Sequence, residues 1–184
     1  MKTRKLFAAL LLLAFAPLAY SAPNLTATLS SPTDLFKAAS GYVTLTLANN
    51  GDSTAHVFSY STPFFNDNDP RLAGDQFKII PHFPTPGAQL SKVAYRGEYL
   101  HPVQPMASMF LLLQPGQSMS VTVSLYPDYQ IHAGQHLRVT FSMMTGWPPE
   151  IYDVGSEADF AQETLHEVTS NTLDITVLQT PPGS

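Results

Sequence analysis

The sequence contains no cysteine among its 184 residues. Disulfide bonds, cysteine-based zinc sites and thiol nucleophiles are therefore excluded. The fold must be held together by burial alone, and a chain of this length is long enough to do so. The length also favours a single domain.

Charged residues are scarce, at 12% of the chain, and basic residues are the scarcer kind, with nine Lys and Arg against 14 Asp and Glu. Nucleic acids and anionic membrane surfaces both require clustered basic side chains. We therefore expect no nucleic-acid partner.

Only one long apolar run is present, from Leu6 to Leu18, and it follows three basic residues near the start of the chain. Ala19-Tyr20-Ser21 then supplies small residues at the positions that signal peptidases favour, which predicts a signal peptide over residues 1–21 and a mature domain over 22–184. The alternative is an uncleaved anchor, but the run is shorter than the ~20 apolar residues that span a bilayer. Cleavage removes three of the nine basic residues and none of the acidic ones, leaving a formal charge of −8. The expected location is periplasmic or extracellular, with no membrane insertion after cleavage.

The clearest secondary-structure signal in the sequence comes from two stretches in which apolar and polar residues alternate strictly. Met119 to Leu125 and Leu137 to Met143 each place every second side chain on an apolar face, which is typical of half-buried strands. Gln114-Pro115-Gly116 predicts a turn before the first of them. Tyr126-Pro127-Asp128-Tyr129, followed by Gly134, predicts a corner crossing between two sheets, as in immunoglobulin-type sandwiches.

Shorter elements surround this pair. Strands are predicted at residues 25–30, 41–48, 55–60 and 171–178, a helix at 156–167, and two strands hidden in the proline-rich section 62–109, at 76–80 and 92–95. The total of about seven to nine short strands predicts an all-β, immunoglobulin-like antiparallel β-sandwich. Its expected core consists of Val43, Leu45, Leu47, Val121, Val123, Leu125, Val139, Phe141, Leu173 and Ile175.

No set of residues forms a recognisable catalytic site. His166-Glu167 begins like a zincin helix but lacks the second histidine, and no serine lies in a nucleophile elbow. His132 and His136 straddle Gly134 at the predicted corner, so only a metal site assembled from distant strands stays open. Asp67 and Asp69 resemble the start of a calcium loop, but Pro70 and a missing distal Glu break that pattern. We expect a non-enzymatic protein with no required cofactor or metal.

Aromatic residues gather in the predicted loops beside prolines. Such side chains either plug the ends of a sandwich or form a contact surface, since they bring large contact area at low entropic cost. The projecting stretches are residues 63–74, 81–105 and 146–155. The candidate partner-binding residues are Phe64, Phe65, Tyr95, Arg96, Tyr99 and Trp147.

The order of several short motifs resembles one known family. The motifs are Thr62-Pro63-Phe64-Phe65, Phe77-Lys78-Ile79, Tyr95-Arg96-Gly97, Leu112-Leu113-Gln114-Pro115-Gly116-Gln117-Ser118, Leu137-Arg138-Val139 and Ser170-Asn171-Thr172-Leu173. This order is similar to the N-terminal pro-region of bacterial aspzincin metalloendopeptidases, the deuterolysin-like peptidyl-Lys group. The resemblance covers roughly Leu25 to Val177.

The resemblance implies a β-sandwich that binds a zinc metallopeptidase and keeps it latent. The catalytic part of that family, with its HExxH motif, has no counterpart in this chain. The expectation is thus a stand-alone inhibitor or folding partner of such a peptidase, a monomer when free. The alternatives are a relic of a zymogen, or an immunoglobulin-like envelope module that binds another protein, a glycan or a metal ion.

Overall fold

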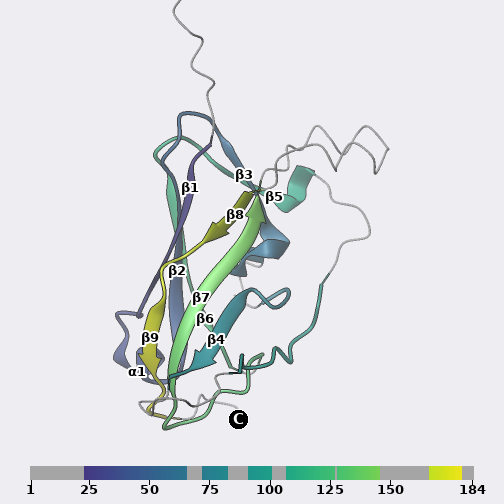
Figure 1. Ribbon diagram of the computed structural model, residues 1–184. Coiled ribbons are helices and arrows are strands. Elements are labelled where there is room, and N and C mark those ends of the chain that lie inside the picture. The colour runs from purple at the N-terminus through teal and green to yellow at the C-terminus, as the bar shows by residue number, and fades with distance from the viewer. Residues whose placement is uncertain are drawn as a thin grey trace, which may run out of the picture.

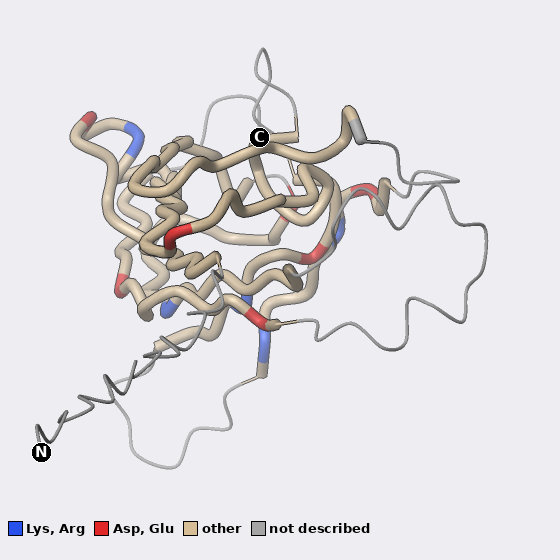
Figure 2. The backbone as a smooth tube through the Cα atoms, turned by 90° about the horizontal axis from the view of Figure 1, so that it is seen from above, with Lys and Arg blue, Asp and Glu red and all other residues tan. Residues whose placement is uncertain are grey.

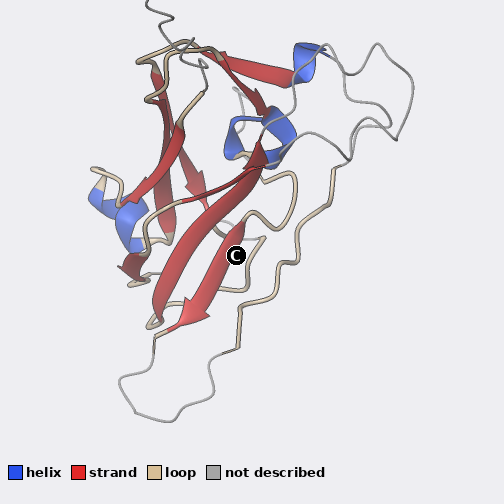
Figure 3. Ribbon diagram, turned by 45° about the horizontal axis from the view of Figure 1, so that its top comes forward, coloured by secondary structure: helices blue, strands red, loops and turns tan. Residues whose placement is uncertain are grey.

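The computed structural model describes residues 23–65, 72–82, 91–100, 107–126, 128–145 and 166–179. Within these ranges the chain forms nine strands, one short α-helix and three 3₁₀ turns (Figure 3). All strand pairs are antiparallel. The predicted all-β sandwich of immunoglobulin type is therefore confirmed.

The first sheet has the order β1 (Leu25–Ser30), β2 (Tyr42–Asn49) and β6 (Ser118–Ser124). The inward side chains of β2 are fully buried, whereas its threonines lie on the outer face. There the Thr44 hydroxyl is 2.8 Å from that of Thr122. This polar ladder makes the outer face flat.

The second sheet is built around β7 (His136–Thr145). One edge of β7 pairs with β4 (Phe77–Pro81), and the other pairs with β9 (Leu173–Thr176) and then β8 (His166–Thr169). The two sheets face each other across the core (Figure 1). A separate two-stranded pair joins β3 (Ala55–Phe58) to β5 (Phe110–Leu113).

One hydrophobic core lies between the sheets, and all ten predicted core residues belong to it or pack against it. Phe141 is fully buried, and its ring centroid lies 5.5 Å from that of Phe77. Val121 and Leu173 are only partly buried because each lies towards the edge of its sheet's apolar face. The period-two pattern thus identified the inward faces correctly.

The corner after β6 carries the chain from one sheet to the other, as predicted. Strands β6 and β7 do not pair with each other, because β6 pairs with β2 and β7 pairs with β4, β8 and β9. Gly134 has φ +87°, a conformation that L side chains rarely adopt, and its N–H donates to the Val177 carbonyl at 2.7 Å. The corner is therefore tied to the end of the last strand.

The helices differ from the sequence-based expectation in two places. Helix α1 (Leu35–Ala39) was not predicted, although Asp34 caps it by accepting from the N–H groups of Phe36 and Lys37. The predicted helix at 156–167 is wrong at its end, since His166 and Glu167 begin β8 and pair with the end of β7. Its remaining residues, 156–165, lie outside the described part of the chain.

The predicted strands in the middle of the chain are also shorter than expected. Strand β3 ends at Phe58, because Ser59–Ser61 form a 3₁₀ turn. Of the two strands predicted within 62–109, β4 is confirmed, whereas residues 92–95 contribute only an isolated bridge from Tyr95 to Tyr129. Strand β5 follows that section and was not recognised.

Candidate functional site

The most elaborate polar arrangement in the described residues starts from Tyr129 in the corner between the sheets. Its side chain is fully buried, and its N–H donates to the Leu125 carbonyl at 2.8 Å. The Tyr129 hydroxyl accepts from the Phe77 N–H at 2.9 Å and donates to Asp75 Oδ1 at 2.8 Å. The corner thereby fixes the position of the chain that leads into β4.

Asp75 connects this tyrosine to a second segment. Its other oxygen, Oδ2, lies 2.5 Å from Lys92 Nζ. Burial raises the pKa of Tyr129 well above its usual range, and the neighbouring Asp75 carboxylate raises it further. The hydroxyl therefore stays protonated and remains available as the donor to Asp75.

Residues 91–100, here called the presenting segment, run along this end of the sandwich without forming a regular strand. Backbone hydrogen bonds hold it at intervals: Val93 N–H to the Ile79 carbonyl at 2.8 Å, Arg96 N–H to the Asp128 carbonyl at 2.6 Å, and Leu100 N–H to the Ala73 carbonyl at 2.8 Å. The segment is therefore fixed to β4, to the corner and to the bend before β4.

Three tyrosine rings, two from the presenting segment and one from the corner, pack edge to face. The ring centroid of Tyr95 lies 5.2 Å from that of Tyr129 and 5.1 Å from that of Tyr99, both at steep interplanar angles that favour aromatic pairs. The Tyr95 hydroxyl donates to the Glu98 carbonyl at 2.8 Å. Burial raises the pKa of Tyr95, with a further contribution from the nearby Asp128 carboxylate.

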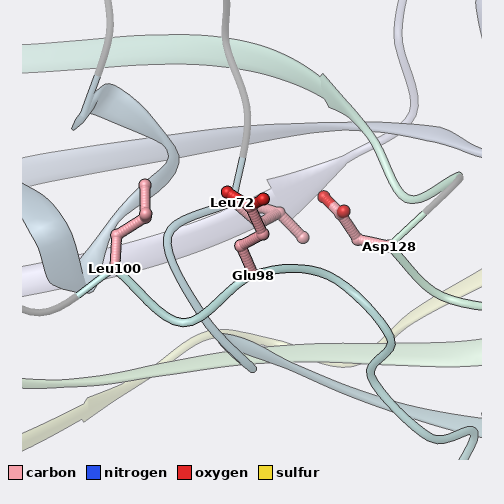
Figure 4. Close-up of a pocket in the computed structure, with 4 residues that line it drawn as sticks. All are labelled: Leu72, Glu98, Leu100 and Asp128. Atoms are coloured by element: carbon pink, nitrogen blue, oxygen red, sulfur yellow. The ribbon is translucent and has the colours of Figure 1, made fainter.

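A small hollow of about 120 Å³ opens beside this stack, lined by Leu72, Glu98, Leu100 and Asp128. Figure 4 shows the carboxylate of Asp128 directed towards that of Glu98, with the leucines alongside. Gly97 forms part of the same region, because a Cβ added there would collide with the Tyr95 hydroxyl and the Asp128 carboxylate. Glycine is therefore required for the segment to pass so close to the corner.

The candidate residues of the presenting segment differ in accessibility. Arg96 is exposed and makes no ion pair with a described residue, and Tyr99 is 59% exposed. Tyr95 is only partly exposed, since its ring lies between Tyr99 and Tyr129. Arg96 and Tyr99 are thus placed for contact, whereas Tyr95 supports them.

Phe64 and Phe65 do not join this surface. Phe64 is 8% exposed and belongs to the core, which makes its ring inaccessible to a partner. Phe65 packs on Tyr60 at a centroid distance of 4.3 Å in a separate aromatic group. Trp147, Asp67 and Asp69 lie outside the described residues.

Asp75 and Lys92 were not recognised as site residues from the sequence. Asp75 is 54 residues from Tyr129 along the chain, and no spacing rule connects two residues that meet only through a sheet corner. The signal that was available is the Tyr-Pro-Asp-Tyr corner itself, because a tyrosine there commonly finds a hydrogen-bond partner.

Metal ligands are not grouped in the described part of the chain, where no three His, Asp or Glu side chains are placed to hold an ion. The Lys and Arg positions are spread over the described backbone (Figure 2). None of the helices in the ranges given above is long and apolar enough to cross a membrane.

Comparison of the sequence with models of known protein families and with curated proteins found no match.

Proposed function

We propose that this protein is an exported, non-enzymatic β-sandwich that binds a zinc metallopeptidase of the aspzincin type and covers its cleft. The observation that carries the proposal is the presenting segment, an irregular stretch held in one position with Arg96 and Tyr99 outward. Arg and Tyr are the residue types that dominate binding energy at protein interfaces.

The anchoring of the segment supports this role. An inhibitor must hold its contact residues in place before binding, because ordering a loose loop on contact costs affinity. The Lys92–Asp75 pair, the Tyr95–Tyr129 bridge and three spaced backbone bonds supply such order here.

The outer faces of the sheets are poorer candidates for the contact. The second sheet carries Arg138 paired with Asp174 at 3.3 Å and the Thr140 hydroxyl 3.3 Å from that of Thr172. These groups already satisfy one another on a flat surface, whereas a peptidase cleft requires a projecting element. The presenting segment lies beside β4 and the corner, where Arg96 and Tyr99 are exposed and where Glu98 and Leu100 line the smaller hollow.

The test is calorimetric titration of the mature chain into an aspzincin peptidase of the organism that encodes it. Arg96→Ala with Tyr99→Ala should weaken binding at least tenfold, which corresponds to about 1.4 kcal/mol, and should leave the thermal midpoint close to that of the wild type. Lys78→Ala is the matched control, because Lys78 is exposed on the outer face of β4 and should not alter affinity.

Tyr95 is unsuitable for that variant, since removing its ring also disturbs the packing of Tyr129. If the double variant binds as tightly as the wild type, the contact surface lies elsewhere. If the wild type does not bind at micromolar concentration, the peptidase proposal fails. An envelope module with another protein, glycan or metal ligand then takes its place.

A further inference from the structure

A second hollow, of about 280 Å³, lies where β4 stops short of the end of β7. We call it the Met144 hollow. The last backbone bond between these strands runs from the Ser142 N–H to the Gln76 carbonyl at 3.2 Å. Before Gln76 the chain turns away, because the Gln76 N–H bonds the Gly74 carbonyl at 2.9 Å.

The end of β7 is therefore left with an open edge at this point. Antiparallel bonds to one neighbour alternate along a strand, so the next residue of β7 with its backbone groups turned towards the β4 side is Met144. Among the described residues, none bonds the Met144 backbone on that side. The Met144 side chain is 44% exposed and forms an apolar wall of the hollow.

Gln76 supplies a buried acceptor that no described residue hydrogen-bonds. Its side chain lines the hollow, the residue is 6% exposed, and its amide nitrogen donates to the Tyr60 carbonyl at 3.0 Å. That bond fixes which amide atom is nitrogen, so Oε1 is the atom left over, and no described residue hydrogen-bonds it. A buried acceptor in this state costs free energy, which a ligand N–H would recover.

Carboxylates complete the lining. Glu167 stands opposite Met144 on β8 and is exposed, and Asp75 contributes from the chain before β4. Asp75 is already paired with Lys92, but Glu167 has no ion pair with a described residue. None of the described residues that line the hollow is basic. The lining side chains offer two carboxylates, an amide oxygen and the hydroxyls of Ser61 and Ser142 around an apolar wall.

We propose that the Met144 hollow binds the side chain of a lysine presented by the protein partner. The aliphatic stem lies against Met144, the ammonium group donates to Glu167, and a small rotation of the Gln76 amide brings its buried Oε1 into reach as a second acceptor. A lysine ammonium has three donors and no acceptor, which matches a lining in which carboxylate and amide oxygens predominate. The net negative charge of the chain favours a basic partner surface in the same way.

The proposal deepens the proposed function, because the lysine would come from the bound peptidase, but the site is testable without it. The probe is Nα-acetyl-lysine methylamide, titrated into the ¹⁵N-labelled mature chain and followed by NMR. We expect shifts at the amides of Ser142 to Met144 and at the side-chain amide of Gln76, with a dissociation constant in the millimolar range.

Three comparisons decide the outcome. Glu167→Gln should weaken binding of the probe about tenfold, since it removes the charge and keeps the shape. Glu98→Gln, in the other hollow, should leave the affinity unchanged. Nα-acetyl-norleucine methylamide, which has the stem without the amine, should bind at least tenfold more weakly than the lysine compound.

Any of three results would overturn the proposal. The lysine compound at about 10 mM causes no shifts at these residues, the norleucine compound binds equally well, or Glu167→Gln leaves the affinity for the lysine compound unchanged. The two proposals fail separately. If the chain binds the lysine compound but no peptidase, this site stands and the proposed function fails. If the chain binds a peptidase but not the lysine compound, the proposed function stands and this site fails.

Discussion

At the scale of single residues, Tyr129 connects the corner to both β4 and the presenting segment. One buried hydroxyl accepts from the backbone of β4 and donates to Asp75, and the ring supports Tyr95. The fold and the candidate site therefore depend on the same side chain.

Replacing Tyr129 with Phe should lower the free energy of unfolding by roughly 1–3 kcal/mol, because the Phe77 N–H is left buried without its partner. Urea unfolding at neutral pH measures the change. Tyr126→Phe is the matched control, since no described residue hydrogen-bonds that hydroxyl, and it should change stability by less than about 0.5 kcal/mol. Equal effects of the two variants would show that the Tyr129 hydroxyl is not structurally important.

Stability should also fall as the pH rises above about 10. The pKa of Tyr129 is raised in the folded state, so above the ordinary value of 10.0 the unfolded chain loses this proton while the folded chain keeps it. The contribution of the Tyr129 proton to the free energy of unfolding is therefore complete below that pH. Above it, the contribution falls by up to about 1.4 kcal/mol per pH unit. Urea unfolding at a series of pH values should give a shallower decline for Tyr129→Phe than for the wild type. Parallel declines would contradict this assignment.

At the scale of elements, the presenting segment depends on a close approach at Gly97. Gly97→Ala should push the Tyr95 hydroxyl and the Asp128 carboxylate aside, because a Cβ there overlaps both. We expect faster amide hydrogen exchange across residues 91–100 with little change in β2 or β6. Gly74→Ala is the control, since a Cβ there meets the Tyr99 ring at an ordinary 3.5 Å. Unchanged exchange in Gly97→Ala would mean that the segment is not held as described.

Strand β1 pairs with β2 along one edge, and a side chain from the opposite sheet bonds its other edge at Leu29. The Asn171 side chain accepts from the Leu29 N–H at 2.8 Å and donates to the Leu29 carbonyl at 3.0 Å, so it occupies the place of a neighbouring strand. Asn171→Ala should leave both groups without a protein partner and raise the exchange rate of the Leu29 amide more than tenfold. Exchange at Leu47, inside β2, serves as the internal reference. A Leu29 amide protected as before would rule out this role for Asn171.

Elements were predictable from the sequence to the extent that one face of each is buried. The alternation in β1, β2, β6, β7 and β9 located the inward side chains, because a period of two has only one interpretation when one face must avoid water. Helix α1 was missed because it buries no residue and so lacks an apolar stripe, although its Asp34 cap was visible. The Asp75–Tyr129 contact was missed because it depends on how the corner meets β4.

At the scale of the whole molecule, a chain without cysteine relies on one core. Phe141→Ala should cost roughly 3–5 kcal/mol, because its ring is fully buried and packs on Phe77. Met144→Ala removes a side chain on the same strand that is 44% exposed and should cost far less. Urea unfolding of both variants measures the difference. Similar losses would contradict the assignment of the inward face of β7.

The central claim is that this sandwich covers the cleft of a metallopeptidase, and inhibition tests it most directly. The measurement is the cleavage rate of an aspzincin peptidase on a small peptide substrate as the mature wild-type chain is added. We predict a rate that falls towards zero at micromolar concentrations of the chain, with the inhibition constant raised at least tenfold by Arg96→Ala with Tyr99→Ala. A cleavage rate that does not change at micromolar concentrations of the wild-type chain would contradict the account.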